Sequence, residues 1–276
     1  KLNKKANISI RVNPNVDPKT HPYISTGLKK NKFGVDEKNA ILMYKIAKKL
    51  DSINIKGIDC HIGSQITELK PFEDSIKKLM ELVNHLKSID IFIKHIDIGG
   101  GIGIKYSKEE PPTFSDYAKT VKNILKDTDL KIIFEPGRAL IGKAGVLLTE
   151  VEFIKNGPEK NFVIVNAAMN DLMRPTLYDA FHKIINLSES KSQKKKYDIV
   201  GPICETGDFL GKDRLLSVEE NNILAILDVG AYGMSMSSNY NSRPKVSEIM
   251  VDDDKFYMIR NRETFADLIN KEQLLP

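Results

Sequence analysis

The chain has 276 residues, of which 41% are hydrophobic and 29% are charged, and its formal net charge at pH 7 is +5. This length and composition predict one large or two ordinary soluble domains. Because the lysines are scattered among acidic residues, with clusters only at 1–5 and 191–196, the small positive charge argues against a nucleic-acid-binding protein.

Neither a membrane span nor a disulfide framework is expected. No apolar stretch approaches the ~20 residues that cross a bilayer, and the first ten residues, KLNKKANISI, lack the apolar core and cleavage site of a signal peptide. Cys60 and Cys204 lie far apart, with no metal-ligand spacing around them. We therefore expect a cytoplasmic protein with no membrane contact and no metal.

The first half of the chain alternates between predicted strands and predicted helices. The short apolar runs that predict strands lie at 8–12, 57–63, 95–101 and 131–138. Segments with helical spacing follow the first three runs, at 37–51, 71–88 and 113–126, and Asp36, Thr113 and Ser115 are typical helix-start residues. This alternation predicts parallel βα units, in either a (β/α)8 barrel or a doubly wound sheet. Four units are only half of an eight-stranded barrel, so either the sheet is open or residues are missing upstream.

After Arg138 the pattern changes to apolar runs without long helices between them. These runs lie at 145–155, 161–169, 196–204, 221–233 and 255–260. They predict a second, mostly antiparallel β domain, a barrel or a sandwich. The boundary falls near 140–145, so we assign residues 1–142 to the α/β domain and 143–276 to the β domain. The segment 188–196, SESKSQKKK, is expected to be a solvated loop.

The loops that follow parallel strands are where function collects in both candidate folds. Gly99–Gly101 follows a strand and suits close approach of the backbone to an anion such as phosphate, although turn glycines alone would also explain it. It is not a dinucleotide fingerprint, because no helix opens directly after it. His61 and Ser64 follow another strand; a core histidine is the alternative, but a ligand contact is favoured at this position.

Glu135 and Arg138 stand together at the end of an apolar strand, in the sequence IIFEPGRAL. One interpretation is a structural ion pair between them, because burying either charge alone is costly. The other is that Glu135 accepts a proton held by a cofactor nitrogen while Arg138 binds an anionic substrate or a phosphate. Each charge would then have its own partner.

Three segments of the second half are dense in polar residues and glycine. They are MRPTLYDA (173–180), CETGDFLGKDR (204–214) and DVGAYGMSMSSNYNSRPK (228–245). Surface turns would explain the glycines but not the gathering of Cys204, Glu205 and Asp208 beside a strand end. Cys204 on its own is equally compatible with an inert buried thiol.

Taken in order, six motifs resemble the signature series of the diaminopimelate decarboxylases, of the alanine-racemase-like (fold type III) class of pyridoxal-phosphate decarboxylases. The motifs are HIGSQ, GGGIGI, EPGR, MRPTLYDAFH, CETGDFLGKDR and AYGMSMSSNYNSRP. The segment RVNPNVDPKTHPYISTGLKKNKFG also fits. EPGR is shared with ornithine and arginine decarboxylases, whereas RPTLYDA together with CETGD points to the diaminopimelate branch.

The resemblance implies roles for the matching residues. His61 would stack on the pyridine ring and Glu135 would pair with its nitrogen. The residues implied in cofactor binding are His61, Ser64, Gly99, Gly100, Gly101, Glu135, Gly137, Arg138 and Tyr232. Those implied in substrate binding are Arg138, Arg174, Tyr178, Glu205 and Tyr232, with the first three on the distal carboxylate. Cys204 would be the proton donor and, with Glu205, would come from the second subunit of a homodimer.

One feature departs from the family. Its Schiff-base lysine lies in a motif like YAVKAN in an early barrel strand, and this chain contains no such motif. We therefore expect the chain to be the C-terminal part of a decarboxylase, comprising half of a (β/α)8 barrel and a β domain. The implied reaction is decarboxylation of meso-2,6-diaminopimelate to L-lysine, and this chain alone is expected to be inactive. An ornithine- or arginine-type decarboxylase and a non-catalytic regulatory homologue are the alternatives.

Overall fold

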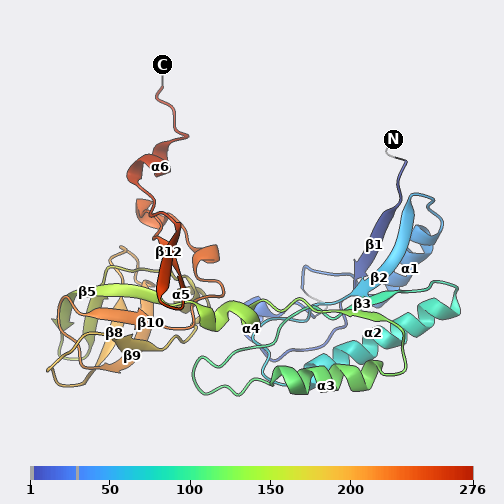
Figure 1. Ribbon diagram of the computed structural model, residues 1–276, viewed down its shortest axis with the longest axis horizontal. Helices are drawn as coiled ribbons and strands as arrows, with labels where there is room; N and C mark the ends of the chain where they lie inside the picture. Colours follow the sequence, from blue (N-terminus) through green and yellow to red (C-terminus); the bar gives the residue numbers. More distant parts are fainter. Residues whose placement is uncertain (1–2, 29–30, 276) are drawn as a thin grey trace. The chain divides into compact units, whose positions relative to one another are not determined.

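Figure 1 shows the computed structural model, which describes residues 3–28 and 31–275. The chain divides into two units, Lys1–Leu140 (unit 1) and Ile141–Pro276 (unit 2). Among the described residues, no helix has both the length and the apolar character needed to cross a membrane.

Unit 1 is a parallel α/β sheet in which strands and helices alternate along the chain. Its elements are β1 (Ala6–Arg11), α1 (Glu37–Lys48), β2 (Ile53–Asp59), α2 (Lys70–Ser88), β3 (His95–Asp97), α3 (Phe114–Leu125) and β4 (Lys131–Ile133), followed by the short α4 (Arg138–Ile141). The four strands are parallel and lie in the order β1-β2-β3-β4. The predicted alternation of strands and helices is confirmed, and the order of the strands follows the sequence.

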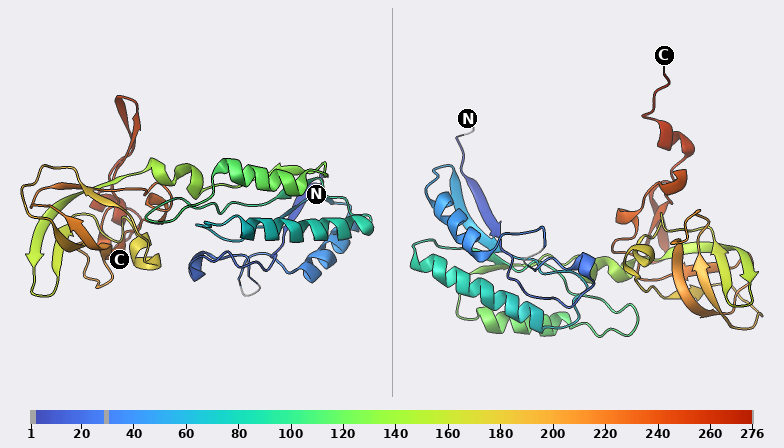
Figure 2. Two further views of the ribbon diagram at one scale, coloured as in Figure 1. Left: turned by 90° about the horizontal axis from the view of Figure 1, so that it is seen from below. Right: turned by 180° about the vertical axis from the view of Figure 1, so that it is seen from behind.

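The three long helices pack on one face of this sheet (Figure 2). Ile58 of β2 and Ile96 of β3 are fully buried beneath them, together with Phe72 of α2. Successive side chains of a strand point to opposite faces, so Asp59 and Asp97, each one residue further along, lie on the face away from the helices. The pleat therefore places polar side chains at the carboxyl ends of β2 and β3.

The element boundaries differ from the predicted ones in a few places. Asp36 and Thr113 are the N-caps of α1 and α3, where their side chains accept hydrogen bonds from the backbone, as predicted. Ser115, also read as a helix start, lies inside α3. The predicted strands at 57–63 and 131–138 end earlier, at Asp59 and Ile133, because their last residues turn away from the sheet to form loops.

Unit 2 is a mixed, nearly closed β-barrel. Its elements are β5 (Leu147–Asn156), β6 (Asn161–Val165), α5 (Arg174–Tyr178), β7 (Ile184–Asn186), β8 (Lys195–Val200), β9 (Phe209–Leu216) and β10 (Ile223–Ile226). The strands lie in the order β7-β10-β5-β6-β8-β9, and the end strands β7 and β9 lie near each other. The domain is mostly antiparallel, as expected, although β6 and β8 are parallel.

Two corrections concern unit 2. The strands β7 and β9 were missed, because β7 is only three residues long and β9 contains the polar run Gly-Lys-Asp-Arg. The segment 188–196 is not simply a solvated loop, since its last two residues begin β8. Ser192 also donates to the carbonyl oxygen of Val218 (3.0 Å) and accepts from its backbone N–H (2.8 Å). The loop is thus tied to the barrel wall by hydrogen bonds.

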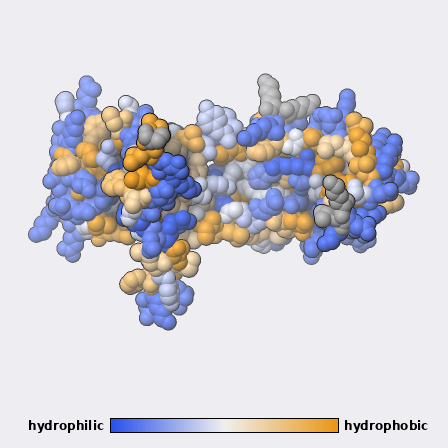
Figure 3. Space-filling view, turned by 90° about the horizontal axis from the view of Figure 1, so that it is seen from above, coloured by the Kyte–Doolittle hydropathy of each residue, from blue (hydrophilic) through white to orange (hydrophobic). Residues whose placement is uncertain are grey.

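The chain ends in a hairpin, β11 (Glu248–Asp252) and β12 (Lys255–Arg260), and a short helix, α6 (Phe265–Ile269). Hydrophobic side chains reach the surface in both units (Figure 3), and the hairpin carries many of them, including Val251 and Phe256. The buried core of unit 2 comes instead from the barrel strands, with Val163, Ile199 and Leu224 fully buried.

Candidate active site

A glycine turn at the end of β3 joins the predicted loops of unit 1. A Cβ on Gly100 would lie 2.1 Å from the carbonyl oxygen of Glu135, and Gly99 has a φ of +68°, so this path excludes larger residues. The backbone N–H of Gly99 donates to Asp97 (2.9 Å), and that of Gly100 donates to Nδ1 of His61 (3.1 Å). Glu135 N–H donates to the carbonyl oxygen of Gly99 (2.9 Å). The turn thus brings HIGSQ, GGGIG and EPGR together.

His61 is held as a neutral imidazole. Because its Nδ1 accepts from Gly100, the ring proton lies on Nε2. Burial lowers the pKa of His61, as does the positive charge of Arg11, while Asp97 opposes this shift. The ring is half-buried rather than a core side chain. A neutral, flat ring fixed at one edge is suited to stacking on an aromatic ligand.

Ser64 and Arg138 form a small polar cluster beside this turn. Arg138 is 5% exposed, and its Nε and Nη2 donate to the Ser64 hydroxyl at 3.3 and 3.2 Å. Its Nη1 donates to the hydroxyl of Tyr106 (2.7 Å). Ser64 accepts these bonds and still has its own hydroxyl proton to donate, for example to a phosphate oxygen. Tyr106 was not predicted, because no motif marks it.

Glu135 presents its carboxyl at the surface of unit 1. Its pKa is raised, first by burial and then by the negative charges of Asp97 and Asp59, while Arg11 lowers it. A carboxylate with a raised pKa is a good partner for a protonated ring nitrogen. Gly137 lies between Glu135 and Arg138, directly before α4.

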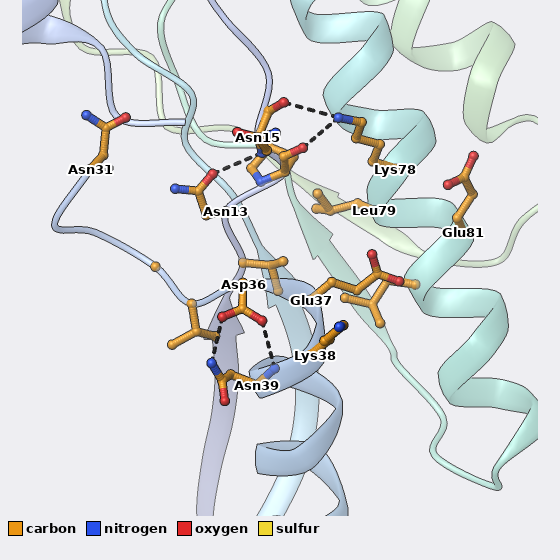
Figure 4. A pocket seen from close by; sticks show the side chains of 15 residues that line it. Asn13, Asn15, Asn31, Asp36, Glu37, Lys38, Asn39, Lys78, Leu79 and Glu81 are labelled. Atoms are coloured by element: carbon orange, nitrogen blue, oxygen red, sulfur yellow. Dashed lines mark hydrogen bonds between the residues drawn. The ribbon is translucent and has the colours of Figure 1, made fainter. Parts of the chain in front are cut away.

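The pocket in Figure 4, with a volume of about 860 Å³, lies elsewhere in unit 1. It is lined by the loop after β1, the start of α1 and the middle of α2, and its described lining contains none of the predicted site residues. Lys78 donates to the carbonyl oxygens of Pro14 (2.8 Å) and Asn15 (3.2 Å), which ties that loop to α2 (Figure 4). Asp36 caps α1. These polar groups serve the fold, so the chemistry favours the strand-end loops.

The three polar segments of unit 2 contact one another. Thr176 of α5 donates to the carbonyl oxygen of Gly207 (2.7 Å). Tyr240 donates to the carboxylate of Glu205 (3.2 Å), and this bond raises the pKa of the Tyr240 hydroxyl. Ser238 N–H donates to the carbonyl oxygen of Asn170 (2.9 Å). The segments therefore form one cluster of loops beside the barrel.

Arg174 is the first residue of α5, and its side chain is 5% exposed. Its Nη1 lies 2.8 Å from Nε2 of His182, and Nδ1 of His182 lies 2.8 Å from the carbonyl oxygen of Leu227. Tyr178, the last residue of α5, is half-buried, and Tyr232 is 42% exposed in a left-handed turn with a φ of +60°.

The loop at 204–208 presents Cys204 and Glu205 at the surface. The alternative that Cys204 is an inert buried thiol is therefore wrong. Asp208 is 3% exposed, and its carboxylate accepts from the backbone N–H groups of Met169 (2.6 Å) and Ile203 (2.9 Å), so it holds the loop in place. The inert thiol is Cys60, since burial raises its pKa to about 12.

The predicted site residues thus form two groups, one in each unit. The group in unit 1 consists of His61, Ser64, Gly99, Gly100, Gly101, Glu135, Gly137 and Arg138. The group in unit 2 consists of Arg174, Tyr178, Cys204, Glu205 and Tyr232. Sequence reasoning missed the residues that hold these groups, and two had a signal: Asp97 stands two residues before Gly99, and His182 ends the motif MRPTLYDAFH.

Residues 1–142 match the family described as "Pyridoxal-dependent decarboxylase, pyridoxal binding domain". The chain is 52% identical over 276 residues to diaminopimelate decarboxylase of Vibrio cholerae, in a match that covers all of this chain and 66% of that protein. Diaminopimelate decarboxylase of Neisseria meningitidis is 51% identical, over 99% of this chain and 67% of its own length.

The fold agrees with these matches. The crystal structure of diaminopimelate decarboxylase from Helicobacter pylori complexed with L-lysine has a TM-score of 0.94 and 46% identity, over 98% of this chain and 68% of that chain. The present chain spans 66% of the length of the Vibrio cholerae relative. With about half of its residues identical along its whole length, and with the glycine turn and the Arg174 loop both in place, the chain belongs to the diaminopimelate decarboxylases, within the pyridoxal-dependent decarboxylase family.

Proposed function

We propose that this protein takes part in the pyridoxal-phosphate-dependent decarboxylation of meso-2,6-diaminopimelate to L-lysine and CO2. The observation that carries the proposal is the buried guanidinium of Arg174, which offers a cation to a substrate with a carboxylate at its far end. An ornithine-type substrate ends in an amine, and a cation at this position would repel it. The L-lysine bound to the Helicobacter pylori relative supports the same substrate class.

The strand-end loops of unit 1 fit pyridoxal phosphate. The hydroxyl of Ser64 offers a donor to a phosphate oxygen, with Arg138 alongside, and Tyr232 would complete this set. The glycine turn at Gly99–Gly101 lets the backbone approach the phosphate closely, while the N–H groups of Gly99 and Gly100 already donate to Asp97 and His61. His61 offers a flat neutral face for the pyridine ring, because its proton lies on Nε2. Gly137 allows the chain to turn beside the cofactor.

When bound, pyridoxal phosphate supplies an electron sink for the charge left at Cα after loss of CO2. Glu135 would hold the proton at the ring nitrogen, because its ionised carboxylate would accept that N–H in a strong, charge-assisted hydrogen bond. Cys204 would then give a proton to Cα, and its thiol is exposed on the surface of unit 2.

The far end of the substrate would be recognised by unit 2. Arg174 and Tyr178 would bind the distal carboxylate, together with Arg138 from the EPGR motif. The carboxylate of Glu205 would bind the distal amine, and the hydroxyl of Tyr240 already fixes its orientation. Opposite charges at the two positions suit a substrate end that carries both an amine and a carboxylate.

We further infer a cytoplasmic homodimer with composite sites. Residues 1–142 would bind the cofactor as part of a (β/α)8 barrel, and residues 143–276 would form the β domain that lends Cys204 and Glu205 to the partner subunit. The exposure of both side chains supports this assignment, because they are available to a second chain. A two-fold interface would make two equivalent sites.

Replacing Arg174 by Ala in the full-length protein tests the substrate. We expect KM for meso-diaminopimelate to rise by the equivalent of about 2–4 kcal/mol, roughly 30- to 900-fold, because the distal carboxylate loses a charged partner. The KM of Arg174→Lys should lie between those of the wild type and Arg174→Ala, because an ammonium group keeps the charge but lacks the planar fork of a guanidinium. Arg260→Ala is the matched control, as it removes an exposed arginine paired with Glu248 on the hairpin. An unchanged KM in Arg174→Ala would rule out the role.

A further inference from the structure

His182 has both ring nitrogens engaged inside unit 2. The residue is fully buried, with Nε2 2.8 Å from Nη1 of Arg174 and Nδ1 2.8 Å from the carbonyl oxygen of Leu227. A guanidinium can only donate and a carbonyl oxygen can only accept. The ring proton must therefore lie on Nδ1, and Nε2 must accept from Arg174. His182 is a neutral imidazole with a single possible tautomer.

The carbonyl end of this chain of bonds is anchored to the barrel. Leu227 follows β10, and its N–H donates to the carbonyl oxygen of Lys183 (2.9 Å), which continues the pairing of β7 with β10. His182 directly precedes Lys183. The imidazole is thus fixed to the barrel wall through the carbonyl group of Leu227, and its other nitrogen fixes the position of Nη1 of Arg174.

The bond to His182 restricts the side chain of Arg174. Arg174 begins a helix of only five residues, α5, which ends at Tyr178 before a left-handed Asp179. An arginine side chain has four rotatable bonds, and holding it in one geometry has an entropic cost. A hydrogen bond to a rigid, buried ring orders the arginine side chain before any ligand binds, so less entropy is lost on binding.

The chemistry of the support matters as much as its position. A carboxylate in place of His182 would hold the guanidinium but would also neutralise it, leaving less attraction for a substrate carboxylate. A neutral imidazole holds Nη1 without cancelling the charge. A protonated imidazole would fail, because its Nε2–H would face the N–H of Arg174.

We infer that His182 is a positioning residue that orients Arg174 towards the distal carboxylate of the substrate without neutralising its charge. This inference rests on the proposed function, in which Arg174 binds that carboxylate. His182 itself touches neither substrate nor cofactor in this account.

Two substitutions in the full-length protein separate the two bonds of the ring. His182→Asn keeps an amide N–H near the place of Nδ1, for Leu227, and removes the acceptor for Arg174. His182→Gln places an amide oxygen near the position of Nε2 and restores that acceptor. We expect KM for meso-diaminopimelate to rise about tenfold in His182→Asn, the loss of one hydrogen bond's worth of binding. In His182→Gln it should rise less than about threefold, with kcat nearly unchanged in both.

A pair of inhibitors shows whether the effect acts on the carboxylate. L-lysine and 1,5-diaminopentane differ only by one carboxylate, which in the proposed reaction belongs to the end of the substrate that does not react. In the wild type, L-lysine should inhibit at lower concentration than the diamine. His182→Asn should reduce the ratio of the inhibition constant of the diamine to that of L-lysine about tenfold, and His182→Gln should restore most of this ratio. A general structural defect would weaken both inhibitors equally and leave the ratio unchanged.

The tautomer gives a readout that is independent of activity. In ¹⁵N-labelled wild-type protein, long-range correlation spectra should show a protonated Nδ1 and an unprotonated Nε2 for His182. The opposite tautomer, or an unchanged inhibitor ratio in His182→Asn, would overturn the inference. Arg174→Ala separates the two proposals: if it reduces the ratio and His182→Asn does not, only the role of His182 fails. If Arg174→Ala leaves the ratio unchanged, the proposed substrate contact fails, and the role of His182 fails with it.

Discussion

The two units hold their candidate residues by different means. In unit 1 the backbone holds the glycine turn and His61, because N–H groups of the turn donate to His61 and to Asp97, while Ser64 and Arg138 bond to each other through their side chains. In unit 2 the bonds run from side chains to distant loops, as in the bonds of His182 to Arg174 and Leu227 and of Tyr240 to Glu205. The parallel sheet positions the first arrangement, whereas the second depends on contacts between loops that are separate in the sequence.

The units also differ in charge. At the strand ends of unit 1, burial raises the pKa of Glu135, and the negative charges of the nearby Asp97 and Asp59 raise it further. Unit 2 instead buries the cation of Arg174 beside a neutral ring. A negative environment suits a protonated pyridine nitrogen, and a buried cation suits a carboxylate. This contrast supports the proposal that unit 1 binds the cofactor and unit 2 binds the far end of the substrate.

If unit 1 of one subunit and unit 2 of its partner build one site, two inactive variants should complement each other. This gain of activity is the largest effect that we expect. His61→Ala disables the unit 1 part and Cys204→Ala disables the unit 2 part of a composite site. In a heterodimer of these two variants of the full-length protein, one site carries both lesions and the other carries neither. Mixing two inactive homodimers should therefore restore activity, approaching about half of the wild-type sites in each heterodimer.

Subunit exchange must be verified in the same experiment, for example by purifying heterodimers with two different affinity tags. A purified heterodimer without activity would show that each site is built within one chain. Cys204 and Glu205 would then no longer belong to the partner's site.

A backbone-built site should tolerate no added side chain, and this predicts an effect on stability. Gly100→Ala places a Cβ 2.1 Å from the carbonyl oxygen of Glu135, and no rotamer change can relieve a contact with backbone. We expect the free energy of unfolding to fall by about 3 kcal/mol in chemical denaturation of the full-length protein. Gly207→Ala in unit 2 is the control, because its nearest neighbour is a methyl group of Thr176 at 3.4 Å. Its effect should stay within about 0.5 kcal/mol, and equal losses in the two variants would contradict the contrast between the units.

The same contrast explains how far the sequence could be interpreted. The alternation of apolar runs and helical segments predicted β1 to β4 and α1 to α3, because periodicity is a local property. The strand-end position of His61 and Gly99–Gly101 followed from it. The roles proposed for Arg174 and Cys204 came from resemblance, because the sequence of their loops indicated a polar cluster beside a strand end but no substrate or reaction.

The missed features are the ones that depend on tertiary contacts. Tyr106 contacts a partner 32 residues away in the sequence, and the carbonyl group that anchors His182 lies 45 residues away, so no spacing rule connects these positions. The nearness of His182 to Arg174 in one motif was the one signal for it. The parallel pair of β6 and β8 was also missed, because strand direction is set by the path of the chain between them. Asp208 was grouped with Cys204, but its burial beneath two backbone N–H groups cannot be predicted from a polar loop sequence.

The smallest expected effect tests the electrostatics of unit 1. Burial is the largest cause of the raised pKa of Glu135, and the negative charge of Asp97 is the second. Asp59 also raises this pKa, and Arg11 lowers it. Asp97→Asn removes that charge, and the Asn amide oxygen can still accept from the N–H of Gly99, so the glycine turn should keep its shape. We therefore expect the pKa of Glu135 to fall in a carboxyl ¹³C NMR titration of the cofactor-free, full-length protein. Asp74→Asn, which removes an exposed charge paired with Lys70 on α2, should leave it unchanged.

The sign of the linked stability change follows from this direction. A carboxyl whose pKa is raised by folding binds its proton more tightly in the folded protein than in the unfolded chain. The free energy of unfolding contributed by Glu135 therefore decreases as pH rises from the ordinary value of a glutamate through the raised value. In Asp97→Asn that decrease should be smaller and should be complete at a lower pH. A pKa of Glu135 that stays the same would show that burial and Asp59 raise it without Asp97, and Asp97 would then serve the glycine turn only through its hydrogen bond to Gly99.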